Sequence, residues 1–377
     1  MSAMSHLAGI AHTRDRQLPL LDPNAALERQ VQWLLTGPAQ RTDGAVAGWV
    51  DADDRADYVY PEITGYYLQW LGWRTTEGDS RFMLGARAAA AQSWLRTWLA
   101  AEGPRLTRVY ADQARDDWRN HAIFCFDVAM ALRGVATAAR RGILDADAAV
   151  VEGLCAVLGE LVAPDGMLDA CRIHDLSPEF PLRWSTQRGA FLAKAAAGIV
   201  DAAHHLPDVP AALRVAAARS FDASIDALCA SPHDETHPLL YAIEGYLALP
   251  AHPCFVANLP SVAARYDELL ARTAAMGRVP ESSTHAGQPR LDIVAQTLRA
   301  GALLAQHGAP LSTMRLAREL ATTLTVATTP DGALPFAQHA GVAQYNTWAT
   351  MFATQALCWA RATPGALIEV ADDPCIV

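Results

Sequence analysis

The sequence predicts an all-α protein whose helices close into an (α/α)6 toroid. Three observations lead to this fold class. Helical spacing of apolar residues dominates the 377-residue chain, and alternating strand patterns are scarce. Apolar helices alternate with amphipathic ones, as buried and half-exposed helices should. The apolar helices also recur roughly every 50 to 70 residues, a period typical of repeated helical hairpins.

Each helix follows from the spacing of its apolar residues and from the abundance of Ala and Leu, both strong helix formers. Amphipathic helices, such as the one ending Arg-Leu-Ala-Arg-Glu-Leu-Ala, should lie outside with one wet face. Helices that are apolar nearly all round, such as 122–132, should be buried. We expect helices at 24–36, 61–73, 80–102, 118–141, 146–163, 187–205, 210–229, 237–249, 256–275, 290–307, 311–327 and 343–362.

A repeated turn supports the hairpin unit. Asp-Gly runs at 42–45, 164–167 and 330–333 each follow an amphipathic helix and precede an apolar one. Six such units can close as a ring, with the loops before the inner helices gathered at one end; an open HEAT- or TPR-type solenoid is the alternative. No Pro/Gly/Ser-rich linker divides the chain. We therefore expect residues 1–377 to form one domain, with 1–20 as a poorly structured N-terminal arm.

Composition and motifs exclude several classes of protein. The net charge is −10 and no Lys/Arg run occurs, so a nucleic-acid partner is not expected. No apolar stretch is long enough for a membrane span. The seven cysteines are scattered without a CxxC pair and no secretory signal is seen, which favours reduced thiols in a cytoplasmic protein. Nucleotide-binding, zinc-protease and serine-hydrolase motifs are absent, so neither a cofactor nor a metal is expected.

Polar and aromatic residues gather at the starts of the apolar helices, more densely than a plain core requires. Each has a structural alternative: Glu62 could stabilise a helix dipole, His237 could be a satisfied core residue, and Asp127 is favoured as a structural partner of an arginine. Their recurrence at one end of successive inner helices is more informative. Sugars are bound by aromatic faces and by charged groups that hydrogen-bond to hydroxyls or carboxylates.

The hypothesis of a carbohydrate site assigns two groups of residues. Glycoside hydrolysis needs two carboxyl groups, and a lyase or epimerase needs a tyrosine or histidine that moves a proton. The catalytic candidates are Glu62, Asp117, Asp292, His237 and Tyr241. The substrate-binding candidates are Tyr66, Arg119, His121, Trp184, Arg188, Arg290, Tyr345 and Trp348.

Several short segments carry a family resemblance: Pro-Glu-Ile-Thr-Gly-Tyr at 61–66, the Asp-Gly turns, Phe126-Asp127, the helix start at 237–245 and the segment 290–296. Through them the chain resembles the six-hairpin glycosidase-like proteins found with bacterial polysaccharide biosynthesis systems. The resemblance implies an (α/α)6 toroid, a carbohydrate ligand, a bacterial setting and association with polysaccharide biosynthesis enzymes. Ile63, Pro238 and the Phe-Asp-Val segment depart from the family pattern, and the resemblance supplies no reaction.

Three hypotheses for function remain open. The first is an enzyme that cleaves a glycosidic bond of a bacterial polysaccharide or oligosaccharide, by hydrolysis or by β-elimination. The second is a sugar epimerase or isomerase of the N-acylglucosamine 2-epimerase type, with His237 moving the proton. The third is a non-catalytic toroid that binds a glycan or an isoprenoid product.

Overall fold

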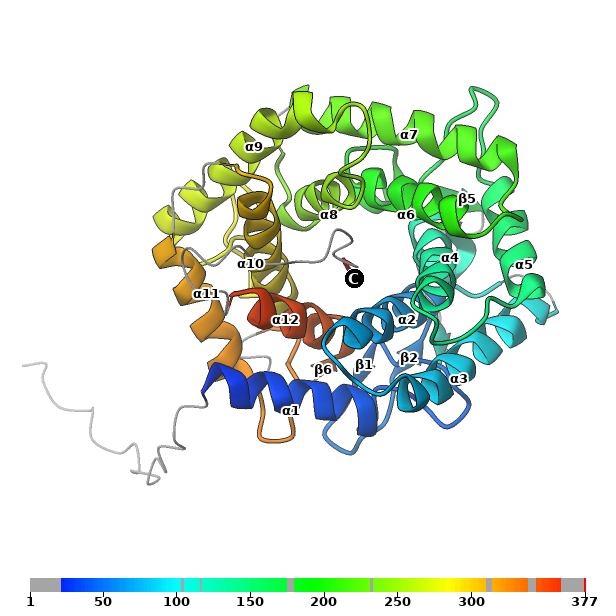
Figure 1. Ribbon diagram of the computed structural model, residues 1–377, viewed down its shortest axis with the longest axis horizontal. Coiled ribbons are helices and arrows are strands. Elements are labelled where there is room, and N and C mark those ends of the chain that lie inside the picture. Colours follow the sequence, from blue (N-terminus) through cyan, green and yellow to red (C-terminus); the bar gives the residue numbers. More distant parts are fainter. Residues whose placement is uncertain are drawn as a thin grey trace, which may run out of the picture.

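The computed structural model confirms the all-α toroid (Figure 1). It describes residues 22–102, 105–115, 117–174, 180–230, 233–309, 314–337, 344–360 and 376–377. The predicted N-terminal arm at 1–20 lies outside these residues. In the described part, no helix is both long and apolar enough to cross a lipid bilayer.

Six inner helices form a closed ring. Consecutive inner helices pack on one another, and the last packs on the first, which closes the circle. They are apolar on nearly every side because each is covered by two inner neighbours and by the outer layer. The inner helices are α2 (Pro61–Thr76), α4 (Cys125–Arg140), α6 (Leu192–His205), α8 (Thr236–Leu247), α10 (Leu291–Gln306) and α12 (Thr347–Ala360).

Six outer helices surround this ring (Figure 1); α1 precedes the first inner helix, and each of the other five connects two inner helices in the chain. Their outward faces are exposed, as their amphipathic sequences predict. Local signals set their ends: Asp147 accepts a hydrogen bond from the Ala149 amide at the start of α5, and Gly277 ends α9 in the left-handed conformation. The outer helices are α1 (Pro23–Thr36), α3 (Arg81–Ala100), α5 (Ala148–Gly159), α7 (Ala211–Ala230), α9 (Phe255–Met276) and α11 (Met314–Ala327).

Short antiparallel strand pairs join the loops at the end of the ring where the inner helices begin. β2 (Tyr58–Val59) pairs with β3 (Val109–Tyr110), and β4 (Ala122–Phe124) pairs with β5 (Cys171–Ile173). The pair of β1 (Trp49–Val50) with β6 (Tyr345–Asn346) connects the first and last hairpins. These pairs fix the loops from which site residues project.

Three predicted helix starts were too early. Residues 118–121 form a 3₁₀ turn and 122–124 a strand, so α4 begins at Cys125 rather than at 118. Asp117 caps the 3₁₀ turn by accepting from the Arg119 amide, which separates it from the following helix. Similarly, a 3₁₀ turn precedes α6, which begins at Leu192, and β6 precedes α12, which begins at Thr347.

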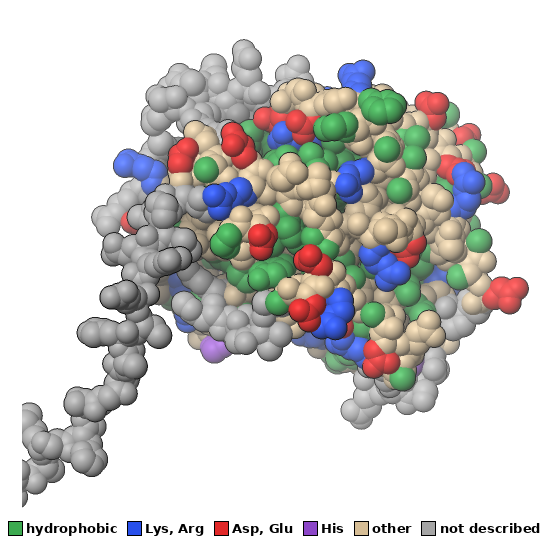
Figure 2. Space-filling model, turned by 90° about the horizontal axis from the view of Figure 1, so that it is seen from below, with side chains coloured by type: hydrophobic (Ala, Val, Ile, Leu, Met, Phe, Trp, Pro, Cys, Tyr) green, Lys and Arg blue, Asp and Glu red, His purple; other side chains and the backbone are tan. Residues whose placement is uncertain are grey.

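The buried side chains of both helix layers form one continuous apolar core. On the face of the molecule seen in Figure 2, acidic and basic side chains are interspersed, and no large patch of one sign appears.

Candidate active site

A cavity of about 340 Å³ opens at the end of the ring where all six inner helices begin. Its volume lies within the range of small-molecule sites. Every inner helix contributes to its wall, either from its first two turns or from the loop just before it. The lining residues are Trp49, Tyr58, Tyr60, Glu62, Thr107, Arg108, Trp118, Arg119, Phe124, Phe126, Asp127, Arg183, Trp184, Ser185, Phe191, His237, Tyr241, Arg290, Phe336 and Trp348.

Aromatic side chains form two panels of this wall. On one side Trp49 packs against Phe336 and Trp348, with ring centroids 5.1 and 5.8 Å apart. On the other side Tyr241 packs against Phe126 at 4.5 Å, and Trp184 lies 6.3 Å from Tyr241. Flat rings of this kind stack on the C–H faces of sugars and also accept cations.

Two carboxyl groups lie side by side in the cavity. Glu62 stands in the first turn of α2 and Asp127 in the first turn of α4, and their side chains hydrogen-bond to each other. Burial raises the pKa of Glu62, while Arg108 and Lys194 oppose that shift. Burial and then the neighbouring Glu62 charge raise the pKa of Asp127 well above its ordinary value. Two carboxyl groups that hydrogen-bond to each other share a proton, and the pair therefore holds that proton more tightly than a solvent-exposed carboxyl does.

Four guanidinium groups face the same space, and they differ in their partners. Arg119 pairs with Asp117 at 3.1 Å, and Arg290 pairs with Asp292 at 2.6 Å. Within the described ranges, Arg108 and Arg183 have no carboxylate within ion-pair distance. Arg108 instead lies over the rings of Tyr58 and Tyr60, at 4.6 and 5.2 Å from their centroids. Arg108 is half-buried and Arg183 is exposed, and a guanidinium in a cavity wall without a carboxylate partner can bind an anion.

His237 begins α8 on the side of the ring opposite α2 (Figure 1). Its ring lies 4.2 Å from the Tyr241 ring and 5.9 Å from the Trp184 ring, centroid to centroid. Burial, followed by the nearby Arg290 charge, lowers the pKa of His237 to about 4. The imidazole is thus neutral near pH 7 and able to accept a proton. Burial raises the pKa of Tyr241 well above its ordinary value, so its phenol stays protonated.

Asp292 lies behind the cavity wall. It is fully buried and accepts hydrogen bonds from Arg290 Nε at 3.1 Å and Nη2 at 2.6 Å, and from Trp348 Nε1 at 3.2 Å. Burial alone would raise its pKa, but Arg290 holds the pKa of this carboxyl below its ordinary value. Asp292 therefore orients two residues of the wall and stays ionised.

The structure brings together about half of the residues predicted for the site. Those lining the cavity are Glu62, Arg119, Trp184, His237, Tyr241, Arg290 and Trp348. The others lie elsewhere. Tyr66 and Asp292 are buried beneath the wall, and Tyr345 lies on β6. Asp117 and His121 line a neighbouring pocket of about 470 Å³, and Arg188 forms ion pairs with Asp165 at 2.5 Å and Asp169 at 2.8 Å.

Sequence reasoning missed several lining residues. The sequence favours Asp127 as a structural partner of an arginine, whereas the structure places it in the cavity wall; its apolar surroundings in the first turn of an inner helix are the signal for such a group. Arg108 lies in a loop far from any helix start, and nothing in the local sequence marks it. Trp49, Trp118 and Arg183 likewise enter the cavity from the loops that the strand pairs hold together.

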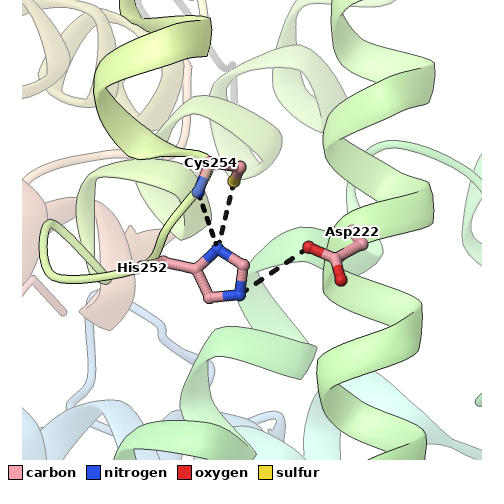
Figure 3. Close-up of side chains that lie close together, drawn as sticks. All are labelled: Asp222, His252 and Cys254. Atoms are coloured by element: carbon pink, nitrogen blue, oxygen red, sulfur yellow. Dashed lines mark hydrogen bonds and ion pairs between the residues drawn. The ribbon is translucent and has the colours of Figure 1, made fainter.

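A cluster of potential metal ligands lies outside the cavity. It joins Asp222 of α7 to His252 and Cys254, which lie just before α9 (Figure 3). His252 Nδ1 lies 3.1 Å from Cys254 Sγ, while its Nε2 lies 3.7 Å from Asp222 Oδ1. Each imidazole nitrogen thus faces a different partner, which suits a hydrogen-bonded relay better than a chelate around one ion.

Comparison with known proteins supports the fold assignment. No family model and no curated protein sequence matches the chain. Similar solved structures include a D-mannose isomerase, at TM-score 0.62 and 11% identity, which covers 89% of this chain and 96% of its own. A glycosidase in complex with glucose matches at a TM-score of 0.59 and 15% sequence identity, and the match covers 90% of this chain and 99% of the glycosidase chain. A type II terpene cyclase from Scytonema, in complex with merosterolic acid A, matches at a TM-score of 0.55 and 14% sequence identity, and the match covers 90% of this chain and 96% of the cyclase chain. The likeness at these identities shows the six-hairpin, (α/α)6 toroid fold that the sequence resemblance implied.

Proposed function

We propose that the protein is a carbohydrate-active enzyme that cleaves an anionic oligosaccharide by β-elimination. One observation carries this proposal. A neutral imidazole, His237, lines the same cavity as a proton-holding carboxyl pair, Glu62 and Asp127, and as the half-buried Arg108. A base, an acid and an anion receptor are the three groups that this reaction requires.

The walls suit a sugar that carries a carboxylate. The aromatic panels offer flat apolar surfaces for the sugar ring. Arg108 and Arg183 offer donors that no described carboxylate occupies, and the planar guanidinium matches a carboxylate with two parallel hydrogen bonds. These features favour a uronate over a neutral hexose.

The chemistry uses each group once. His237 takes the proton from the carbon next to the uronate carboxylate, and the electron pair moves toward that carboxylate, where arginine stabilises the charge. The electron pair then forms a carbon–carbon double bond as the glycosidic carbon–oxygen bond breaks. The Glu62–Asp127 pair donates its proton to the departing oxygen. The products are an unsaturated uronate and a free hydroxyl end.

Hydrolysis by two carboxylates fits this cavity less well. Glycosidases place their carboxyl groups on two sides of the scissile bond, about 5 Å apart or more. Glu62 and Asp127 are close enough to hydrogen-bond, so they act as one proton donor. Asp117 and Asp292 do not line the cavity and are engaged by Arg119 and Arg290. Elimination needs only one acid and one base.

Epimerisation or isomerisation of a sugar is the second candidate. It begins with the same proton abstraction, but the proton returns to carbon and no bond to oxygen breaks. The likeness to a D-mannose isomerase favours this candidate. The likeness to a terpene cyclase raises a third chemistry, protonation of an alkene, but four guanidinium groups in the wall suit a hydrocarbon poorly. From the sequence resemblance, we infer that the substrate derives from a bacterial polysaccharide.

The test is a panel of uronate-containing and neutral oligosaccharides of defined length. We expect ultraviolet absorbance from an unsaturated uronate with the acidic members only. His237→Asn and Asp127→Asn should each lower turnover about 100-fold or more, as loss of a general base or acid does. His252→Asn and Asp222→Asn are matched controls outside the cavity and should keep full turnover.

Other outcomes would redirect the assignment. Deuterium incorporation at a sugar carbon without cleavage would identify an epimerase or isomerase. Release of a new reducing end together with a saturated uronate, and no ultraviolet absorbance, would identify a hydrolase. Tight binding of the acidic oligosaccharides with no product after long incubation would identify a glycan-binding toroid. Turnover of neutral oligosaccharides alone would overturn the anionic substrate.

A further inference from the structure

A buried chain of polar side chains runs from His237 into the centre of the ring. His237 Nδ1 lies 2.7 Å from Gln296 Oε1, and Gln296 Nε2 donates to Glu244 Oε2 at 3.2 Å. Lys194 Nζ donates to the same Glu244 oxygen at 2.8 Å, and Arg299 donates to the other. Gln296, Glu244, Lys194 and Arg299 are all fully buried.

Glu244 is held in its ionised form. Burial alone would raise the pKa of this carboxyl, but Arg299 and Lys194 lower it below its ordinary value. Lys194 is itself fixed, because its ammonium also donates to the main-chain oxygen of Val377 at 2.9 Å and lies 4.7 Å from the centre of the Tyr66 ring. The carboxylate is therefore a permanent acceptor at a fixed place.

The ionised carboxylate decides which way the Gln296 amide points. Its NH₂ group must face Glu244, because the reverse orientation would bring two acceptor oxygens to about 3 Å from each other. The amide oxygen must then face His237. An oxygen accepts a hydrogen bond only from a protonated nitrogen, so His237 Nδ1 carries the hydrogen.

We propose that Gln296 and Glu244 are positioning residues that hold His237 as its Nδ1–H tautomer, with Nε2 as the nitrogen that accepts the substrate proton. The catalytic part of this inference rests on the proposed function. In a neutral imidazole only one nitrogen has a free lone pair. With the hydrogen fixed on the Gln296 side, the lone pair lies on the other side of the ring. Gln296 does not line the cavity and acts only through His237.

The tautomer is measured directly by nitrogen-15 NMR of the full chain labelled at histidine. The His237 signals are assigned by their loss in His237→Asn. We expect a protonated Nδ1 and an unprotonated Nε2 in the wild type. Gln296→Met keeps the length and burial of the side chain but removes the acceptor, and should shift the hydrogen toward Nε2. Gln69→Met is the matched control, because Gln69 is an equally buried glutamine whose amide donates to Gly65 and Met130 main-chain oxygens.

Kinetics separate positioning from simple stability. Gln296→Met should lower kcat on the uronate oligosaccharide at least tenfold, since a base in the wrong tautomer is severely impaired. KM should stay within about twofold, because the cavity wall is unchanged.

Each outcome decides the inference. An unprotonated Nδ1 in the wild type, or an unchanged tautomer in Gln296→Met, would overturn it. Equal loss of kcat in Gln69→Met and Gln296→Met would also overturn it, because the loss would then reflect the core. If the tautomer follows Gln296 but no acidic oligosaccharide is turned over, the positioning role stands and the proposed elimination fails.

Discussion

The crossing of α2 and α4 gives the sharpest prediction, because these helices carry the two carboxyl groups. Gly65 lies one turn after Glu62, against the α4 main chain. A Cβ at Gly65 would lie 2.3 Å from the Met130 carbonyl oxygen and 2.5 Å from the Ala131 nitrogen. Main-chain atoms inside a helix cannot rotate away. Gly65→Ala should therefore push the two helices apart.

The expected magnitude is the difference of two effects. Adding a methyl group to a tightly packed core costs about 1 to 3 kcal/mol. Replacing glycine by alanine within a helix contributes up to about 1 kcal/mol in the other direction. We expect a net loss of about 1 to 2 kcal/mol in the free energy of unfolding. The displacement should also separate Glu62 from Asp127 and lower turnover.

Urea denaturation of Gly65→Ala, followed by circular dichroism, measures this loss. Gly159→Ala is the matched control: Gly159 ends α5, and no atom lies within 4 Å of where its Cβ would be. The control should be as stable as the wild type or slightly more so. If Gly65→Ala matched Gly159→Ala in stability and kept full turnover, the close crossing would have no role in holding the acid pair.

Two further predictions concern charge. The folded pair holds a proton that the unfolded chain releases, so the pair's own contribution to stability should fall as the pH rises above about 4. The stability of Asp127→Asn should therefore rise relative to the wild type over that range, and parallel pH profiles of the two proteins by urea denaturation would contradict the raised pKa. Asp292→Ala removes the acceptor of Arg290 and Trp348, and should lower the free energy of unfolding by about 3 kcal/mol in the same measurement. Asp43→Ala is the control: its ion pair with Arg41 is exposed, and its loss should cost less than about 1 kcal/mol.

The sequence predicted the helices well because their signal is local. Each inner helix is apolar on all sides and each outer helix on one face, and that pattern survives in any closed ring of hairpins. The errors at 118, 187 and 343 share a cause. In each case polar and aromatic residues just before the helix resemble its first turn, but they form a 3₁₀ turn or a strand instead.

The site was harder to predict because it depends on contacts between distant loops. Glu62 and His237 could be found since they begin inner helices, where the ring gathers its ends. Arg108 could not, because it reaches the cavity only through the pairing of β2 with β3. Asp292 shows the opposite error. It also begins an inner helix, but its ion pair with Arg290 turns it away from the cavity.

The net charge of −10 gives a misleading view of the ligand. Parallel inner helices direct all six of their N-termini toward the cavity, and helix N-termini carry partial positive charge. Arg108 and Arg183 add to that potential, because no described carboxylate lies within ion-pair distance of either, while Glu62 and Asp127 share a proton. The local field is therefore positive inside an acidic protein. The ring both attracts an anion and keeps the proton donor beside it, because burial outweighs the positive field at Asp127.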